Sequence, residues 1–365
     1  HEHRRQRQMC IRDRYYYDLN ENKSIKIPNG NDHICLENLD ESATIWKNEE
    51  ASIKNIGDGI INVEFHSKMN TIGGGILNAL NHAIDMAEKG LYKGVVISNE
   101  GANFSAGANV GMIFMLAAEQ EFEELNMVVK AFQNTTMRLR YSSIPVIAAP
   151  HGMALGGGCE ICLHADKVIA HAETYMGLVE FGVGLIPGGG GTKEMALRFS
   201  DGLRNGDMRI NRFRDNFLTI GQAKVSSSAD EAFELGYLRK GIDEVIVSRK
   251  NQISYAKKVC LQMVKKGYNQ QAKRKDITVL GQEGLGIVYA GANSMKSGNY
   301  MSEHDQLISE KLGYVLCGGD LSQLTEVSED YLLKLERKEF IELCMERKTL
   351  ERIQSLLQKG KILRN

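Results

Sequence analysis

The stretch PHGMALGGGCE, residues Pro150 to Glu160, decides how this sequence is interpreted. Its three consecutive glycines, Gly156 to Gly158, allow the backbone to approach a bound group, and the helical pattern after them would direct unpaired N–H groups at it. Glu160 follows within two residues, and a second acid, Glu180, lies twenty residues further on. This pattern predicts a site that stabilises a transient oxyanion while two carboxylates move protons.

Strand-like and helical segments alternate on both sides of this stretch, which predicts a layered α/β fold. The strand-like segments are residues 60–66, 94–98, 145–150, 167–170 and 174–177, and the helical ones are residues 76–89, 110–141 and 193–199. The loop 99–109 also follows a buried strand and precedes a helix. Because ligands collect at the carboxyl ends of strands, N–H groups from both loops can point at one oxygen. The alternative is that the glycines only permit close packing of helix on strand.

Outside this core the chain divides into three further segments. Residues 1–14 are basic and lack any period, so we expect a non-native or artefactual segment that is excluded from the fold. Residues 15–50 are polar and weakly patterned, as expected of a linker or the end of a missing upstream domain. The α/β domain would occupy residues 51–247, with a polar surface insertion at 200–217. Residues 248–365 would form a C-terminal helical region that packs on the core or on another subunit.

The composition of the 365-residue chain gives no argument for a nucleic-acid partner, because 45 basic residues nearly balance 46 acidic ones. Seven cysteines are scattered, and only Cys159 and Cys162 have CxxC spacing. A zinc site would need further ligands at matching spacing, so we expect buried thiols and no metal site. Because no apolar run is long enough to span a bilayer and no secretory signal is recognisable, we expect a cytoplasmic protein.

Three candidate motifs, two for nucleotide binding and one for a serine nucleophile, do not match the residue patterns that these functions require. In GGGGTK, residues 188–193, the threonine precedes the lysine, so it is no Walker A loop. GVGLIP, residues 182–187, has proline where a dinucleotide fingerprint needs its third glycine. Ser105 and Ser142 lie outside any Gly-x-Ser-x-Gly elbow. A nicotinamide site or a serine triad in this chain is therefore not expected.

Three segments, taken together and in order, resemble the signatures of the crotonase, or enoyl-CoA hydratase/isomerase, superfamily: FSAGAN (104–109), PVIAAPHGMALGGGCE (145–160) and GLVEFGVGLIPGGGGT (177–192). The resemblance implies a spiral ββα core, a CoA thioester substrate and an oxyanion hole of two backbone N–H groups. Those donors fall on Ala108 and Gly157. Asn109 and Val179 depart from the Asp and Pro that many members carry, which bears on substrate fit.

Within this superfamily the acids that are present indicate the reaction. Hydratases carry glutamates at both positions that fall here on Glu160 and Glu180, whereas isomerases typically keep one. An enoyl-CoA hydratase, a hydro-lyase of fatty-acid β-oxidation, is therefore expected, with Glu160 as base and Glu180 as acid, although the roles of a coupled pair are not separable from sequence. The alternatives are a Δ3-Δ2-enoyl-CoA isomerase and a non-catalytic docking module.

Substrate contacts are also implied by position in the family pattern. They fall on Lys68, Ala106 and Gly156, and for Lys68 a solvated loop lysine is an equally good interpretation. No cofactor is expected in this chain, since CoA is part of the substrate.

A narrower resemblance covers most of residues 38–365. Segments such as GNYMSEHD (298–305) and YLLKLERKEF (331–340) are similar to the C-terminal part of bacterial bifunctional 3-hydroxyacyl-CoA dehydrogenase/enoyl-CoA hydratase chains. It implies a multifunctional protein whose NAD-binding dehydrogenase part is missing here. The chain would then be a fragment that packs against that part or forms a homo-oligomer.

Overall fold

The computed structural model describes residues 15–19, 21–26, 33–204 and 206–365. The expected artefactual segment, residues 1–14, lies outside the described residues. Among the described residues, no helix has the length and apolar character needed to cross a membrane.

A seven-stranded sheet forms the centre of the molecule, in the order β11-β9-β7-β6-β5-β4-β3. Within this sheet β4 pairs antiparallel with both β3 and β5, whereas β5, β6, β7, β9 and β11 run parallel to one another. The bounds are β3 Thr44–Lys47, β4 Ala51–Asn55, β5 Ile60–Phe65, β6 Gly94–Ile97, β7 Val146–Ala148, β9 Lys167–His171 and β11 Glu244–Ile246. Residues 44–47, within the segment expected to be linker, thus pair with the edge of this sheet.

A second, smaller sheet pairs β8 (Gly152–Leu155) in parallel with β10 (Thr174–Gly177). Isolated bridges extend it on both sides, from Ser105 to Ala154 and from Gly177 to Val225. Successive turns of the chain therefore give a strand to the large sheet, an extended segment to the small one, and then a helix. This repeat is the spiral ββα core that the resemblance implied.

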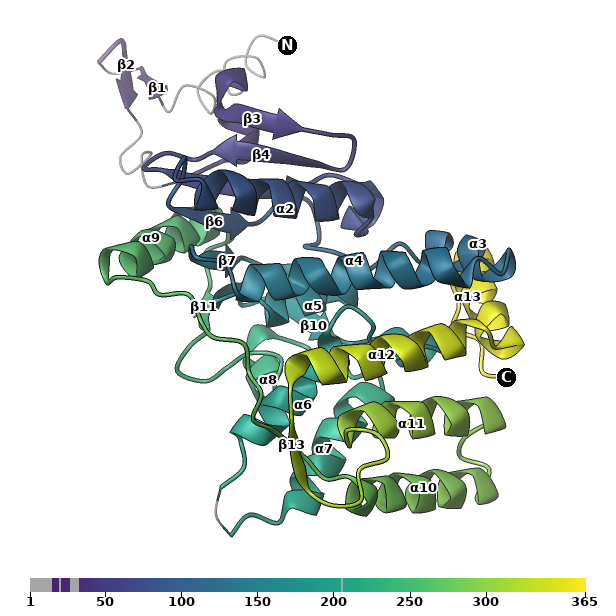
Figure 1. The fold of residues 1–365 in the computed structure, drawn as a ribbon. Helices are drawn as coiled ribbons and strands as arrows, with labels where there is room; N and C mark the ends of the chain where they lie inside the picture. The colour runs from purple at the N-terminus through teal and green to yellow at the C-terminus, as the bar shows by residue number, and fades with distance from the viewer. Residues whose placement is uncertain (1–14, 20, 27–32, 205) are drawn as a thin grey trace.

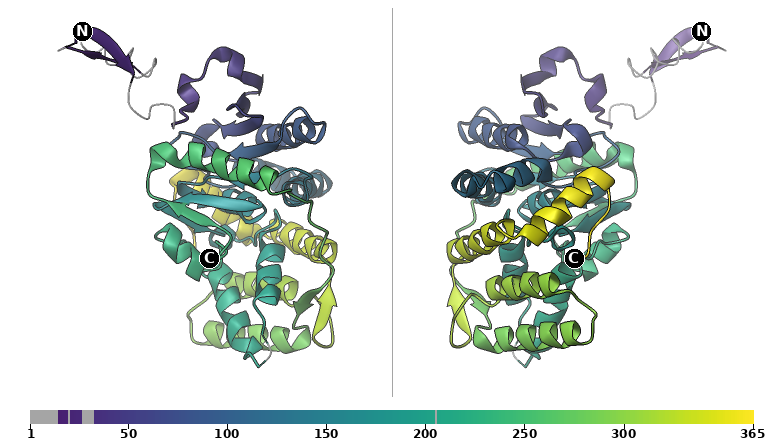
Figure 2. Two further views of the ribbon diagram at one scale, coloured as in Figure 1. Left: turned by 90° about the vertical axis from the view of Figure 1, so that its left-hand side faces the viewer. Right: turned by 90° about the vertical axis from the view of Figure 1, so that its right-hand side faces the viewer.

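Alternating side chains on the strands bury both faces of the large sheet. On β6, Val95 and Ile97 pack in one apolar cluster, whereas Val96 belongs to another on the opposite face. The first cluster includes the apolar side of α2 (Gly74–Glu88). The second is closed by α9 (Gln252–Lys265), a helix of the C-terminal region that lies in front of the strands in Figure 2, left. Covering both faces explains why these parallel strands are continuous apolar runs.

Two helical segments differ from the sequence expectation. Residues 110–141 form two helices, α3 (Val110–Ala118) and α4 (Phe122–Arg140), because Gln120 between them takes a positive φ of 60°. Residues 200–217, expected to be a polar surface insertion, begin α7 (Arg209–Gly221) in their second half, where most side chains up to Phe217 are exposed or partly exposed. Phe213 on α7 is 1% exposed and meets Phe199 edge-on, with ring centroids 6.0 Å apart. That apolar contact outweighs the polar composition of the segment.

The C-terminal helices continue the core. In Figure 1, α12 runs between α4 and α11, and contacts join α12 to α4, α6 and α11, and α13 to α3. Their bounds, with the remaining elements, are α5 Gly157–Leu163, α6 Gly191–Asp201, α8 Ala229–Glu234, α10 Gln282–Ser297, α11 Glu303–Leu316, α12 Glu329–Cys344, α13 Arg347–Lys359, and the antiparallel pairs β1 Tyr15–Asp18 with β2 Lys23–Lys26 and β12 Ile277–Val279 with β13 Thr325–Val327. Helix α12 therefore packs directly on the domain that carries the glycine motif.

Candidate active site

Each of the three glycines, Gly156 to Gly158, is required for a different structural reason. Gly156, the N-cap of α5, has φ 50° and ψ −123°, a conformation that L side chains rarely adopt. A Cβ atom at Gly158 would lie 2.6 Å from Cβ of Ser105, so this glycine lets α5 sit directly on the neighbouring strand segment. A Cβ atom at Gly157 would lie 3.2 Å from the amide nitrogen of Ala108. The packing interpretation therefore holds for Gly158, whereas Gly157 keeps open a space beside a backbone N–H.

The peptide of Ala108 is fixed on both sides. Ile72 donates its N–H to the carbonyl of Gly107 at 2.8 Å and accepts from the N–H of Asn109 at 3.1 Å. Gly107 has φ 106°, and Asn109 caps α3 through its side chain. In the part of the chain that the structure describes, neither Ala108 nor Gly157 donates its N–H to a protein acceptor. Both N–H groups are thus unused, and the backbone of Gly157 closely approaches the Ala108 nitrogen, as the two donors of an oxyanion hole would have to.

Glu160 lies in the first turn of α5 and is 3% exposed. Its Oε1 accepts the N–H groups of Gly189 and Gly191, both at 2.8 Å. Those bonds favour the ionised carboxylate, but burial, followed by the charges of Glu180 and Glu336, is the larger influence and raises the pKa of Glu160 well above its usual range. Glu160 is therefore a buried acid held by glycines at the start of α6.

Glu180 begins the 3₁₀ turn η4 (Glu180–Val183), directly beside the glycine motif. Its Oε1 would lie 2.8 Å from a Cβ atom at Gly156. Although the residue is partly exposed as a whole, Oε2 is buried and has no hydrogen-bond partner among the described residues. Burial is the main cause that raises the pKa of Glu180 to about 7. A buried carboxyl oxygen without a partner, with a pKa near neutrality, is suited to exchange protons with a bound molecule.

The remaining predicted residues border this site. Gly156 accepts the N–H of Glu160 at 2.9 Å, and Ala106 donates its N–H to the carbonyl of Met69 at 3.1 Å. Lys68 precedes Met69 in the 3₁₀ turn η3 (Lys68–Asn70) and is exposed. The structure thus brings six of the seven predicted residues into one compact arrangement, with Lys68 on the solvent side of it.

A third carboxylate, Glu336, was missed by the sequence analysis. It comes from α12 and is fully buried. Its oxygens accept the N–H groups of Gly190 at 2.6 Å and Lys193 at 2.9 Å. The signal was present in the sequence, because Leu332, Glu336 and Phe340 share one helix face at four-residue spacing, which puts a charge on the buried stripe.

A series of buried hydrogen bonds supports the helix that carries Glu160. Nδ1 of His164 lies 2.7 Å from the carbonyl of Glu160, and Nε2 lies 2.9 Å from Nζ of Lys193. Burial and the charge of Lys193 hold the pKa of His164 well below its usual range. The neutral ring therefore donates from Nδ1 and accepts at Nε2. Lys193 also pairs with Glu329 of α12 at 3.0 Å, so α5, α6 and α12 are joined at this site.

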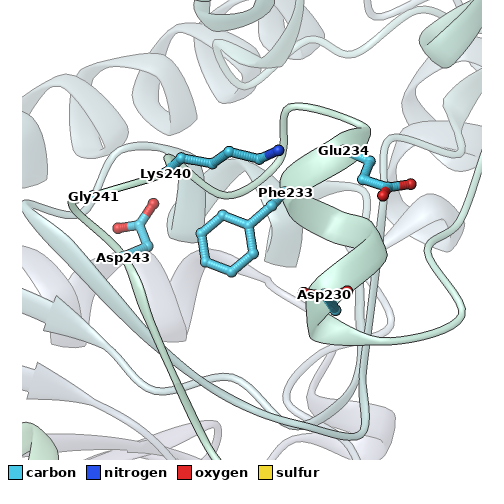
Figure 3. Close-up of a pocket in the computed structure, with 6 residues that line it drawn as sticks. All are labelled: Asp230, Phe233, Glu234, Lys240, Gly241 and Asp243. Atoms are coloured by element: carbon cyan, nitrogen blue, oxygen red, sulfur yellow. The ribbon is translucent and has the colours of Figure 1, made fainter.

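Two surface hollows contain none of the predicted residues. One of about 310 Å³, drawn in Figure 3, is lined by Asp230, Phe233, Glu234, Lys240, Gly241 and Asp243. Its most buried acid, Asp243, already pairs with Arg239 at 2.9 Å and accepts the N–H of Val168. The other, of about 620 Å³, begins at Phe181 and continues along residues 295–305. The predicted site residues therefore lie outside both hollows.

Comparison with known proteins agrees with this geometry. Residues 55–199 match the family model described as enoyl-CoA hydratase/isomerase. Over these residues the chain is similar to the crotonase superfamily, and its fold is the crotonase fold. All seven predicted site residues lie within the matched range of the crotonase family, and Glu336 lies outside it. A carnitinyl-CoA dehydratase from Mycobacterium thermoresistibile (TM-score 0.61, 15% identity, 85% of this chain and 90% of that one) has the same fold. So has an enoyl-CoA hydratase from Bacillus halodurans (TM-score 0.57, 16% identity, 84% of this chain and 100% of that one).

Curated relatives extend beyond the crotonase match. A Bacillus subtilis protein named "Probable 3-hydroxyacyl-CoA dehydrogenase" is 43% identical over 96% of this chain and 44% of its own length. A Rickettsia felis protein named "Putative fatty acid oxidation complex trifunctional enzyme" is 29% identical over 88% of this chain and 40% of its own length. The chain thus spans less than half the length of these curated relatives.

Proposed function

We propose that this chain is a crotonase-superfamily enoyl-CoA hydratase that adds water to a trans-2-enoyl-CoA to give a 3-hydroxyacyl-CoA. The observation that carries the proposal is the pair of buried carboxylates, Glu160 and Glu180, on either side of the glycine turn. The unused N–H groups of Ala108 and Gly157 lie at the same turn. A hydration needs one group to remove a proton from water and another to deliver a proton to carbon.

The two N–H groups would stabilise the charge that develops during the reaction. Water adds to C3 of the conjugated thioester, and the electron pair of the C2–C3 double bond moves onto the thioester oxygen. Ala108 and Gly157 would donate to that oxygen, and loss of one such donor typically costs about 3 kcal/mol of barrier, roughly a hundredfold in rate.

The carboxylates would move the two protons. As expected from the sequence, Glu160 would take the proton as water bonds to C3. The two N–H bonds to its Oε1 stabilise the ionised form that this step requires, against the burial that raises its pKa. Oε2 of Glu180 is buried and unpartnered, so a proton carried there can pass to C2 and return the enolate to a thioester. The mutual influence of the two charges favours one shared proton near neutral pH. Water supplies every atom that is added.

We also propose that the chain corresponds to the hydratase part of a multifunctional cytoplasmic protein of fatty-acid oxidation. The names and lengths of the Bacillus and Rickettsia relatives support this proposal. A dehydrogenase part would bind NAD, whereas the hydratase part would take CoA only as part of its substrate. The 3-hydroxyacyl product has the alcohol that such a dehydrogenase would oxidise.

Product analysis tests the proposed reaction. Purified chain is incubated with crotonyl-CoA and, separately, with a 3-enoyl-CoA, while the absorbance of the conjugated enoyl thioester is followed. A hydratase removes this absorbance from crotonyl-CoA and yields 3-hydroxybutyryl-CoA. Formation of the absorbance from the 3-enoyl thioester, without hydration of crotonyl-CoA, would replace the proposal with an isomerase. Binding without turnover of either would favour a docking module.

A further inference from the structure

Residues 188–193, called the glycine loop below, hold Glu160 on one side. A carboxylate of the C-terminal region holds the same loop from its other side. Along the loop, the N–H groups of Gly189 and Gly191 bond to Glu160, whereas those of Gly190 and Lys193 bond to Glu336. Neighbouring backbone donors therefore point to opposite sides, toward two different buried acids. A displacement of either acid would move the loop and, with it, the donors that orient the other.

Glu336 is itself rigidly supported. Its Oε1 also accepts from Nε2 of Gln133 at 3.1 Å, and Gln133 is oriented in turn by Arg337, which donates to its Oε1 at 2.7 Å. Because Gln133 is on α4 and the loop leads into α6, this one side chain ties α12 to two helices of the crotonase domain. Side chains that are fixed by several bonds of this kind can hold a reacting group in position.

We propose that Glu336 is a positioning residue for the Glu160–Glu180 pair: through the glycine loop it fixes the carboxylate of Glu160, and its charge tunes proton transfer by both acids. This inference rests on the proposed function of the pair. It makes α12, which lies outside the residues matched by the family, a working part of the active site.

The charges around Glu336 determine the direction in which its removal shifts the pKa of Glu160 and of Glu180. The charged groups that face it are Glu160 from α5, Glu180 from η4 and Lys193 from α6, while α4 contributes the neutral Gln133. From α11, Lys311 is engaged by Glu339 and Glu342. Burial raises the pKa of Glu336 to about 7, and its negative charge raises the pKa of both Glu160 and Glu180. Removing that charge should therefore lower the pKa of both acids.

The test compares Glu336→Gln with Glu339→Gln. Glu339 is a matched control, because it lies on the same helix and is 4% exposed, but its carboxylate bonds to Lys311 and not to the loop. We expect E336Q to lower kcat about ten- to a hundredfold, with KM changed less than about twofold. Both limbs of its pH–rate profile should move to lower pH, whereas the profile of E339Q should match the wild type. E336D, which keeps the charge on a shorter arm, should lose rate but retain the wild-type profile.

A second readout does not depend on activity. Protein is labelled with carbon-13 at the glutamate carboxyls, and the resonance of Glu160 is assigned through its loss in E160Q. Its titration midpoint should fall by about half a pH unit or more in E336Q, and stay unchanged in E339Q. A midpoint that does not move in E336Q, relative to E339Q, overturns the inference even if stability drops. Lack of hydration by the wild type would instead refute the proposed function, while the titration would still decide the role of Glu336.

Discussion

The Cα atom of Gly157 stands so close to the backbone of Ala108 that a Cβ atom on it would lie 3.2 Å from the Ala108 nitrogen. The same atom would lie 2.9 Å from Cζ of Phe132. Glycine at 157 is therefore required by the close approach of Phe132 and of the Ala108 nitrogen, and not by its own φ angle. The oxyanion hole proposed for this chain lies between the N–H groups of Ala108 and Gly157.

Gly157→Ala should consequently abolish most of the activity. The added methyl group would enter the position of the thioester oxygen, so we expect kcat to fall at least about a hundredfold. Gly291→Ala is the control, because a Cβ atom there meets nothing within 4 Å and α10 exposes it. This control should leave kcat unchanged and stabilise the protein by roughly 0.5–1 kcal/mol. Equal activity of the two variants would contradict the proposed position of the substrate.

The stability of the protein should fall as Glu180 ionises. Its folded-state pKa is about 7 against an ordinary value of 4.5, so the neutral form is favoured by folding. That contribution is fully present below the unfolded pKa and is lost as the pH rises through about 7. Glu180→Gln should therefore be more stable than the wild type at pH 8 by about 1–3 kcal/mol, and about equal to it near pH 4.5. Denaturant unfolding at both pH values measures this, and a difference independent of pH would argue against a buried, ionisable Glu180.

Lys68 should act on substrate binding alone. It is exposed beside Met69, whose carbonyl holds the Ala106 loop, and this position suits contact with the phosphates of CoA. Lys68→Ala should raise KM about two- to fivefold, more at low salt than at high salt, and leave kcat unchanged. Lys89→Ala, an exposed lysine at the far end of α2, should change neither constant. Identical kinetic constants of the two variants would show that Lys68 is a solvated lysine that does not contribute to substrate binding.

Much of the core could be predicted because its signals are local. The apolar runs of β5 and β6 are found where the patterns indicated them. The glycines of the active site were also recognisable, since their spacing to Glu160 and Glu180 lies within one short stretch. Three separate reasons for Gly156, Gly157 and Gly158 became visible only from the contacts of each position.

What the sequence could not provide depends on distant contacts. Nothing near Phe213 indicates that Phe199 will bury it, so a polar composition was interpreted as surface. Glu336 is 176 positions from Glu160 in the chain numbering, and only the packing of α12 on α4 and α6 brings it to the glycine loop. Charged residues on the apolar stripe of a helix are the sequence signal for such contacts, and they identify the residue but not its partner.

The most direct measurement follows the hydration of crotonyl-CoA in water labelled with heavy oxygen, comparing the wild type with Glu160→Gln, Glu180→Gln and the double variant. We predict that the wild type forms 3-hydroxybutyryl-CoA with the label on C3. Each single variant should be slower by about a hundredfold or more, and the double variant little slower than the worse single one, because the two acids act as a unit. Labelled product formed at the wild-type rate by the double variant would contradict the assignment of the reaction to this pair of carboxylates.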